Sequence, residues 1–154
     1  MFKSSSTDKD YDPKTGCLNW PNELSRFHNE QLQKELGRLR ELHPHVTIIY
    51  ADYYNAVMRF YLSPHQFGFM EGSVLRACYE HGRPSNFNES GPCGISPPVC
   101  CDNPSSFASW DGLHYTEAAY RWIAQGLLQG PYTNPRISTI CPSTSRGVDG
   151  YYEY

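Results

Sequence analysis

The chain has 154 residues, a length that suits one domain and buries ~68–70% of the unfolded surface. Its 13 basic and 16 acidic residues give a net charge of −3 without any basic run, which argues against a surface for duplex nucleic acid. No stretch approaches the ~20 apolar residues of a membrane-spanning helix. The 12 Tyr, 7 Phe and 3 Trp residues fit either broad amphipathic pockets or a carbohydrate-facing surface.

Residues 1–16 are polar and form an irregular leader in our prediction. The next segment predicts an amphipathic helix over residues 22–42, because apolar residues recur there every three to five positions and Pro44 follows its end. Residues 46–54, with the sequence VTIIYADYY, are apolar, β-branched and aromatic. This pattern is typical of a strand buried on both faces, as in a parallel sheet covered by helices.

A shorter helix is expected over residues 54–61, ended by Ser63-Pro64. Residues 63–109 are rich in Pro, Gly, Ser, Asn and Cys, and we expect only a short strand at 74–78 and a long cross-linked loop. The last helix is predicted over residues 117–129, with Thr116 as its N-cap. Its buried stripe is expected to consist of Ala119, Trp122, Ile123 and Leu127.

These elements indicate an α/β layered fold with a main unit at residues 17–135 and a flexible tail at 136–154. A parallel sheet needs strands on both sides of each member, and this chain supplies too few of them. We therefore expect unpaired strand edges and a marginal or aggregation-prone fold for the chain by itself.

The segment SWDGLHYTEAAYRWIAQGLLQG places Asp111 and His114 three positions apart, just before the last helix. A histidine that acts as a general base needs a carboxylate to fix its tautomer and stabilise the imidazolium. The turn at Gly112 allows Asp111 to fold back onto the ring. The alternative is that Asp111 binds backbone amides of the turn and His114 is an ordinary surface residue; the pattern D-x-x-H alone does not choose between them.

Six cysteines in so short a chain suit an oxidising compartment and are disulfide candidates, with 15 possible pairings: Cys17, Cys78, Cys93, Cys100, Cys101 and Cys141. The sequon at Asn88 is a candidate glycosylation site and points to the same compartment. A zinc site built from Cys93, Cys100, Cys101 and His81 is the weaker alternative, because the spacing lacks a C-x-x-C pair. We expect no metal and no cofactor.

Several other polar and aromatic residues have both a functional and a structural interpretation. Tyr50, Tyr53, Tyr54 and Tyr61 fit a substrate cleft, but such residues more often lie at core edges. Asp52 follows the expected strand, where functional residues of α/β sheets tend to lie, and is equally suited to capping the next helix. His43 and His45 resemble a metal pair but are more typical of a turn at a helix C-terminus.

The sequence resembles the C-terminal half of plant GDSL-type esterases/lipases of the SGNH hydrolase superfamily. The resemblance is carried by residues 15–69, beginning TGCLNWPNELSRF, by LRACYE and NFNESGPCG, and by residues 103–135, which contain SWDGLHYTEAAY. It implies the C-terminal portion of a flavodoxin-like, three-layer α/β/α sandwich. It also implies secretion, a small-molecule or lipid ester substrate, and roles for Asp111 as the orienting acid and His114 as the general base.

The sequence departs from the family pattern in its nucleophile. No Gly-Asp-Ser motif and no Gly-x-Asn-Asp motif occurs in the chain, and residues 1–16 contain no apolar segment of a secretory signal. Ser105, Ser106 and Ser109 lie near the dyad but lack the Gly-flanked setting of a nucleophile. We therefore expect the chain alone to be inactive. The alternative is a truncated, non-catalytic binding or structural relative.

Overall fold

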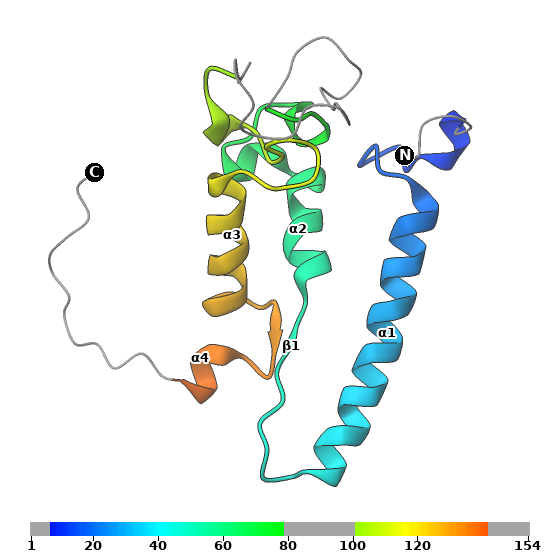
Figure 1. The fold of residues 1–154 in the computed structure, drawn as a ribbon, viewed down its shortest axis with the longest axis vertical. Helices are drawn as coiled ribbons and strands as arrows, with labels where there is room; N and C mark the ends of the chain where they lie inside the picture. The colour runs from blue at the N-terminus through cyan, green and yellow to red at the C-terminus, as the bar shows by residue number, and fades with distance from the viewer. Residues whose placement is uncertain (1–6, 79–100, 142–154) are drawn as a thin grey trace, which may run out of the picture.

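The computed structural model describes residues 7–78 and 101–141, and the structural statements that follow concern these residues. Two antiparallel neighbours, α2 and α3, form one body, and the longer α1 stands apart from them at the end of an extended connection (Figure 1). The helices are α1 (Asn19–Leu42), α2 (Tyr53–Leu62), α3 (Glu117–Leu128) and α4 (Ile137–Ile140), and the strands are β1 (Tyr50–Ala51) and β2 (Thr133–Asn134). Single 3₁₀ turns lie at Asp8–Asp10, Pro64–Phe67, Ser73–Leu75 and Pro104–Ser106.

Helix α1 confirms the predicted amphipathic helix and extends it by one turn at its N-terminus. Pro21 lies in the first turn, where a backbone N–H has no partner within the helix and its loss costs little. His43 caps the C-terminus, and its N–H donates to the Leu39 carbonyl 2.9 Å away. Pro44 follows and prevents continuation, so the helix ends where the sequence predicts.

The strand predicted over residues 46–54 is wrong in length, direction and burial. Only Tyr50 and Ala51 pair, and they pair antiparallel with Asn134 and Thr133. Tyr50 is buried and Ala51 is exposed, so the strand is covered on one face and not on both. The physical reason is the lack of neighbours: among the described residues, the segment after α3 is the one that reaches this backbone.

The core lies between α2 and α3 and the loops at one end of them. Its largest fully buried side chains are Phe60 and Phe69, whose rings meet edge to face with centroids 5.2 Å apart. Ala119 and Ile123 of α3 are buried against them, as predicted. Trp122 and Leu127 are partly buried at the edge of this cluster, and the Trp122 indole donates to the Phe67 carbonyl at 3.1 Å. The predicted stripe is therefore confirmed.

The strand predicted at residues 74–78 is also wrong, because its first two residues belong to the 3₁₀ turn Ser73–Leu75. Gly72 has a left-handed conformation with φ +75°, which starts the turn, and the Ser73 hydroxyl donates to the Ser106 carbonyl at 2.7 Å. Extended backbone remains only near Ala77, which forms an isolated parallel bridge with Ser109. The side-chain bond of Ser73 thus replaces strand pairing over this segment.

The predicted leader and the predicted tail each contain a short helical turn. In the predicted irregular leader, Thr7 and Asp10 form a capping box around a short 3₁₀ turn. In the predicted flexible tail, Ile137–Ile140 forms one helical turn, α4. Residues 142–154 lie outside the described part of the chain, as do residues 1–6. Over residues 7–78 and 101–141, no helix is long and apolar enough to cross a membrane.

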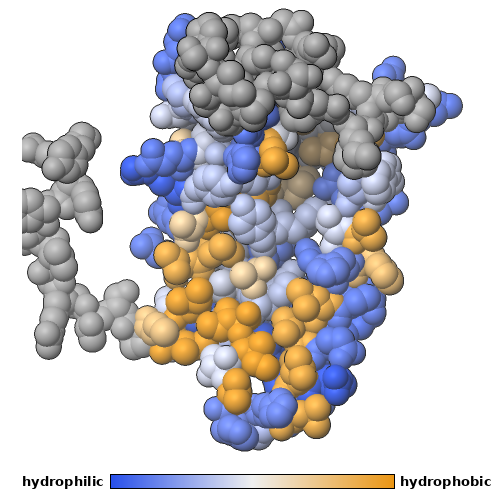
Figure 2. Space-filling view, in the orientation of Figure 1, coloured by the Kyte–Doolittle hydropathy of each residue, from blue (hydrophilic) through white to orange (hydrophobic). Residues whose placement is uncertain are grey.

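Hydrophobic side chains are exposed over much of the molecule. Figure 2 shows them gathered over the lower half of one face, over the ends of α3 and the two strands, and along the side of α1 that faces them. On α1, Leu24 is 59% exposed and Phe27 is 62% exposed. Taken together, the described residues form a mixed α/β structure with a small two-stranded sheet, and much of its apolar surface has no cover from these residues.

Candidate functional site

Asp111 and His114 lie in a five-residue loop that is closed at its base by backbone pairing. Ser109 and Tyr115 form an isolated antiparallel bridge, and the Trp110 N–H donates to the His114 carbonyl at 2.9 Å. Gly112 sits at the tip with φ +88°, a conformation that glycine adopts without the steric cost that a Cβ adds. The loop is therefore short and its reversal depends on this glycine.

The Asp111 carboxylate binds both the backbone of this loop and the His114 ring. Its Oδ1 accepts hydrogen bonds from the Leu113 N–H at 2.9 Å and the His114 N–H at 2.6 Å. Its Oδ2 lies 2.7 Å from His114 Nδ1. The two alternatives for this pair are thus compatible: the same carboxylate caps the turn with one oxygen and meets the imidazole with the other.

The two side chains differ in exposure in the way that a base and its orienting acid require. The Asp111 side chain is 13% exposed, and that of His114 is 62% exposed. When Nδ1–H donates to Asp111, the neutral ring carries its lone pair on Nε2. Among the described residues, Nε2 makes no hydrogen bond, so the geometry can support proton transfer between Nε2 and a group brought to the surface of the loop.

The dyad loop joins α3 through Thr116, which confirms the predicted N-cap. The Thr116 hydroxyl accepts a hydrogen bond from the Ala119 N–H at 3.3 Å and donates to the Phe107 carbonyl at 2.7 Å. The Thr116 N–H also donates to the Ala108 carbonyl at 2.9 Å. Thr116 is buried, so these bonds fix the start of α3 to the strand-like segment that precedes the loop.

The three serines near the dyad do not bind His114. The Ser106 hydroxyl is buried and donates to the Asn103 carbonyl at 2.8 Å. The Ser109 hydroxyl accepts from the Gly112 N–H at 3.0 Å, and the Ser105 N–H donates to the Asn103 side chain. Ser109 was not predicted as part of the site. In the sequence, Ser109 stands three residues before the turn glycine Gly112. This pattern is too short to identify Ser109 as part of the site.

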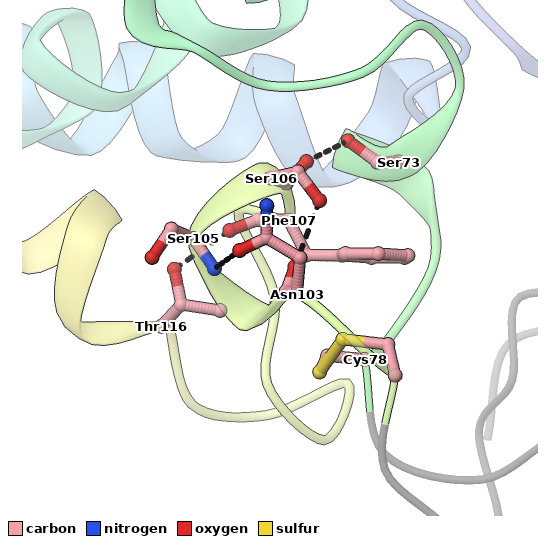
Figure 3. The surroundings of a disulfide bond; sticks show 8 residues. Ser73, Cys78, Asn103, Ser105, Ser106, Phe107 and Thr116 are labelled. Carbon is pink, nitrogen blue, oxygen red and sulfur yellow. Dashed lines mark hydrogen bonds between the residues drawn. A yellow bond between two sulfur atoms is a disulfide. The ribbon is translucent and has the colours of Figure 1, made fainter.

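The cysteines divide into bonded and free residues. Cys78 and Cys101 form a disulfide between the segments on either side of the undescribed residues 79–100 (Figure 3). Cys17 and Cys141 have free thiols, contrary to their selection as disulfide candidates. Cys17 is half-buried near the start of α1, where burial raises the pKa of its thiol. Cys93, Cys100 and the sequon at Asn88 lie outside the described residues.

The four tyrosines singled out in the sequence lie at a cavity and at the small sheet. A cavity of about 290 Å³ between the start of α1 and α2 is lined by Tyr53, Tyr54, Tyr61 and Tyr115, together with smaller side chains. Tyr50 is buried at the small sheet. Burial raises the pKa of the Tyr61 phenol and of the Tyr115 phenol. Tyr115 directly follows His114, so the dyad loop contributes one wall of this cavity.

The remaining candidate residues have structural roles. Asp52 is the N-cap of α2, and its carboxylate accepts from the Asn55 N–H at 3.1 Å. His43 caps α1, and its carbonyl accepts from the Val46 N–H. Cys101 is committed to its disulfide, which removes it from the weaker zinc alternative, and His81 lies outside the described residues. No group of three His, Cys, Asp or Glu residues that could hold a metal ion occurs in the described segments.

Known proteins share this sequence over most of its length. A family model described as GDSL-like Lipase/Acylhydrolase matches residues 5–127. A GDSL esterase/lipase of Arabidopsis thaliana is 50% identical over 141 residues, which are 92% of this chain and 35% of the relative. A second one is 52% identical over 137 residues, which are 89% of this chain and 36% of the relative.

A further relative, the sinapine esterase of Brassica napus, is 46% identical over 141 residues, which are 92% of this chain and 36% of that protein. No solved structure matches the chain. The chain thus spans about a third of the length of these relatives. This share agrees with the resemblance to a C-terminal portion. Since the family model covers residues 5–127, the chain belongs to the GDSL-like lipase/acylhydrolase family.

Proposed function

We propose that this chain supplies the general base of a carboxylic ester hydrolase, with His114 as the base and Asp111 as the residue that orients it. The observation that carries the proposal is the 2.7 Å contact between Asp111 Oδ2 and His114 Nδ1, in a loop whose backbone is held by the other Asp111 oxygen. An orienting carboxylate is effective only when it is itself fixed, and here two amides fix it.

In the proposed reaction, His114 Nε2 accepts the proton of a serine hydroxyl while the serine oxygen attacks the ester carbonyl carbon. The imidazolium then gives this proton to the departing alkoxide, which leaves as an alcohol and generates an acyl-enzyme. A water molecule then attacks the acyl-enzyme while His114 Nε2 accepts a proton from it. The imidazolium returns this proton to the serine oxygen, and the carboxylic acid is released. Throughout, Asp111 holds the Nδ1–H and stabilises the positive charge that forms on the ring.

The nucleophilic serine and the oxyanion donors in this proposal come from the Gly-Asp-Ser and Gly-x-Asn-Asp blocks of the family, which these 154 residues do not contain. None of the described serines near the loop binds His114; Ser106 and Ser109 use their hydroxyl groups within the loop structure. We therefore propose that the chain hydrolyses esters only together with a segment that carries those blocks. The ester is a small molecule or a lipid, as in the family.

The exposed apolar side of α1 supports a further part of the proposal, the three-layer α/β/α sandwich. Residues 46–51 have the composition of a buried strand but pair at two positions only, and Leu24 and Phe27 are more than half exposed. A helix with an apolar stripe gains stability when that stripe is covered. We propose that further strands of the sandwich cover this stripe in the complete protein. We also propose that the complete protein is extracellular, as the resemblance to the family implies.

The test compares the chain alone with the chain fused behind a segment that carries the missing blocks, taken from the Arabidopsis relative that is 50% identical. We expect the 154-residue chain to release no p-nitrophenol from p-nitrophenyl acetate above the rate of its His114→Ala variant. We expect the fusion to be active. In the fusion, His114→Ala removes the activity, and Asp111→Asn lowers kcat by roughly 10⁴-fold, as in serine hydrolase triads.

The matched control in the fusion is His28→Ala, which removes an exposed imidazole on α1 whose partner, within the described part of the chain, is the neighbouring Asn29 side chain. Unchanged activity in this variant assigns the loss to His114. A fusion that is folded and hydrolyses the ester equally well with and without His114 would overturn the proposed role. A folded fusion without any activity would favour the alternative, a non-catalytic relative that keeps this part of the fold as a binding or structural module.

A further inference from the structure

The Cys78–Cys101 disulfide lies where the backbones around residues 77–78, 101 and 109 are joined by hydrogen bonds, next to the base of the dyad loop. The Cys101 N–H donates to the Cys78 carbonyl at 2.8 Å, so the two cysteines are joined by a backbone bond as well as by sulfur. The Cys78 N–H in turn donates to the Ser109 carbonyl at 2.9 Å. The disulfide is therefore one hydrogen bond away from the residue that begins the dyad loop.

Ser109 is the connection between this disulfide and the dyad. On one side it pairs in parallel with Ala77, and on the other side it pairs antiparallel with Tyr115. Its hydroxyl accepts the Gly112 N–H at 3.0 Å, inside the loop. Ser109 thus bonds to the segment before the disulfide, to the end of the loop, and to the glycine at the tip of the loop.

Burial differs sharply between the base of the loop and its tip. Cys78, Ala77 and Ala108 are buried almost completely, whereas the side chains of Leu113 and His114 are mostly exposed. The tip therefore obtains little stability from packing, and its conformation depends on the hydrogen bonds made at its base. Figure 3 shows Cys78 near the turn that contains Ser105 and Ser106, and Thr116 on the other side, where it binds the carbonyl of Phe107, the residue that follows this turn.

We propose that the Cys78–Cys101 disulfide and Ser109 are positioning residues for the dyad: they hold the loop in the conformation in which Asp111 faces His114 Nδ1. Neither forms a hydrogen bond with His114 among the described residues, and both act on the dyad through the backbone of the loop. Removing the cross-link lets the segments at 77–78 and 101–109 separate more readily, and the Cys78-to-Ser109 bond opens with them. The loop then loses its fixed base, and the Asp111 contact with Nδ1 is made for a smaller fraction of the time.

The catalytic meaning of this inference rests on the proposed function, but its test does not. The measured quantity is the tautomer of His114, read from the ¹⁵N chemical shifts of its ring nitrogens by NMR on the complete 154-residue chain without any ester. The proton resides on the ring nitrogen whose hydrogen bond the protein provides. We expect the Nδ1–H form in the unmodified chain, and assign its signals by their loss in His114→Gln.

The main variant is the pair Cys78→Ala and Cys101→Ala, which removes the cross-link without leaving a reactive thiol. We expect the Nε2–H form to appear and amide hydrogen exchange at Gly112 and His114 to accelerate by about tenfold or more. The matched control is the pair Cys17→Ala and Cys141→Ala, which removes two cysteines that are free. This control is expected to change neither quantity.

Ser109→Ala tests the same connection without touching the disulfide, because it removes one hydrogen-bond acceptor near the loop tip. We expect faster exchange of the Gly112 amide and a smaller shift toward the Nε2–H form. An unchanged tautomer in both variants would overturn the proposal. So would equal acceleration of exchange throughout α2 and α3 in the cysteine variant together with no effect of Ser109→Ala, because the disulfide would then stabilise the whole core and not the loop.

Discussion

The body built from α2, α3 and the dyad loop contrasts with α1 in how each obtains its stability. Phe60, Phe69 and Ile123 are buried between the first group of elements, and the hydrogen bonds of Thr116 and Ser109 extend this order to the dyad. Helix α1 is twice as long as α3, with 24 residues against 12, yet contributes no residue to the buried core formed by the described segments. Length and periodicity therefore do not by themselves produce packing.

This difference shows where the candidate site obtains its geometry. The dyad lies on the packed body, and the buried residues at its base keep the short loop in place through backbone hydrogen bonds. The α1 side carries exposed leucine and phenylalanine side chains. It is joined to the small sheet by polar contacts such as those of the Arg40 guanidinium, which donates to the Ile48 and Asn134 carbonyls at 2.8 Å. Removing a large side chain from each region measures this contrast directly.

The largest effect is expected for Phe60→Ala, which removes a fully buried ring between α2 and α3. We expect it to lower the free energy of unfolding by about 3–5 kcal/mol, since the deletion loses apolar burial and leaves a cavity. Urea unfolding monitored by circular dichroism measures the change. Phe27→Ala on α1 is the matched control, and we expect less than about 0.5 kcal/mol from it because that ring is mostly exposed. Similar losses in both variants would contradict the division into two regions.

The second effect concerns the junction of the dyad loop with α3. Thr116→Ala removes the hydroxyl that caps the helix and binds the Phe107 carbonyl, and we expect a loss of about 1–2 kcal/mol in the free energy of unfolding. Thr139→Ala is the control, since its hydroxyl donates to the Arg136 carbonyl in an exposed turn. A change below about 0.5 kcal/mol is expected there. Equal losses in the free energy of unfolding for the two variants would contradict the role of Thr116 in fixing the dyad loop to α3.

The third effect lies at the boundary between the two regions, where Tyr61 of α2 faces the cavity beside α1. Burial raises the pKa of Tyr61 above its ordinary value of about 10, so the unfolded chain loses this proton at a lower pH than the folded chain does. The resulting stability is present below pH ~10 and is lost as the pH rises above it, by up to about 1.4 kcal/mol per pH unit.

Tyr61→Phe tests this pH dependence, because it keeps the ring and removes the titrating hydroxyl. We expect the free energy of unfolding of the variant to fall less steeply between pH 10 and 11 than that of the unmodified chain, as measured by urea unfolding at each pH. Part of the slope remains in the variant, since burial also raises the pKa of Tyr115. Parallel curves for the two proteins would show that Tyr61 is not enclosed at this boundary.

The sequence by itself determined the three longer helices and the N-cap at Thr116. The cap at Asp52 and the contact of Asp111 with His114 were each one of two interpretations that the sequence allowed. These features depend on residues within four positions of one another, where spacing and backbone geometry leave few choices. The segment VTIIYADYY has equally clear local signals, and its prediction was wrong, because a strand exists only through its partners. The short strand expected at residues 74–78 did not form. Its place is taken in part by a turn in which the Ser73 hydroxyl binds the carbonyl of Ser106, 33 positions away.

Only the tertiary structure decided which cysteines pair, that Ser109 joins the disulfide to the loop, and that Asp111 uses its two oxygens for two purposes. Six cysteines are chemically equivalent in the sequence, so the pairing of Cys78 with Cys101 depends on which backbones run side by side. The same holds for Ser109, whose partners Ala77 and Tyr115 lie on opposite sides of it in space. The order of neighbouring residues predicts which face of a helix is buried, but it does not specify which distant segment lies against that face.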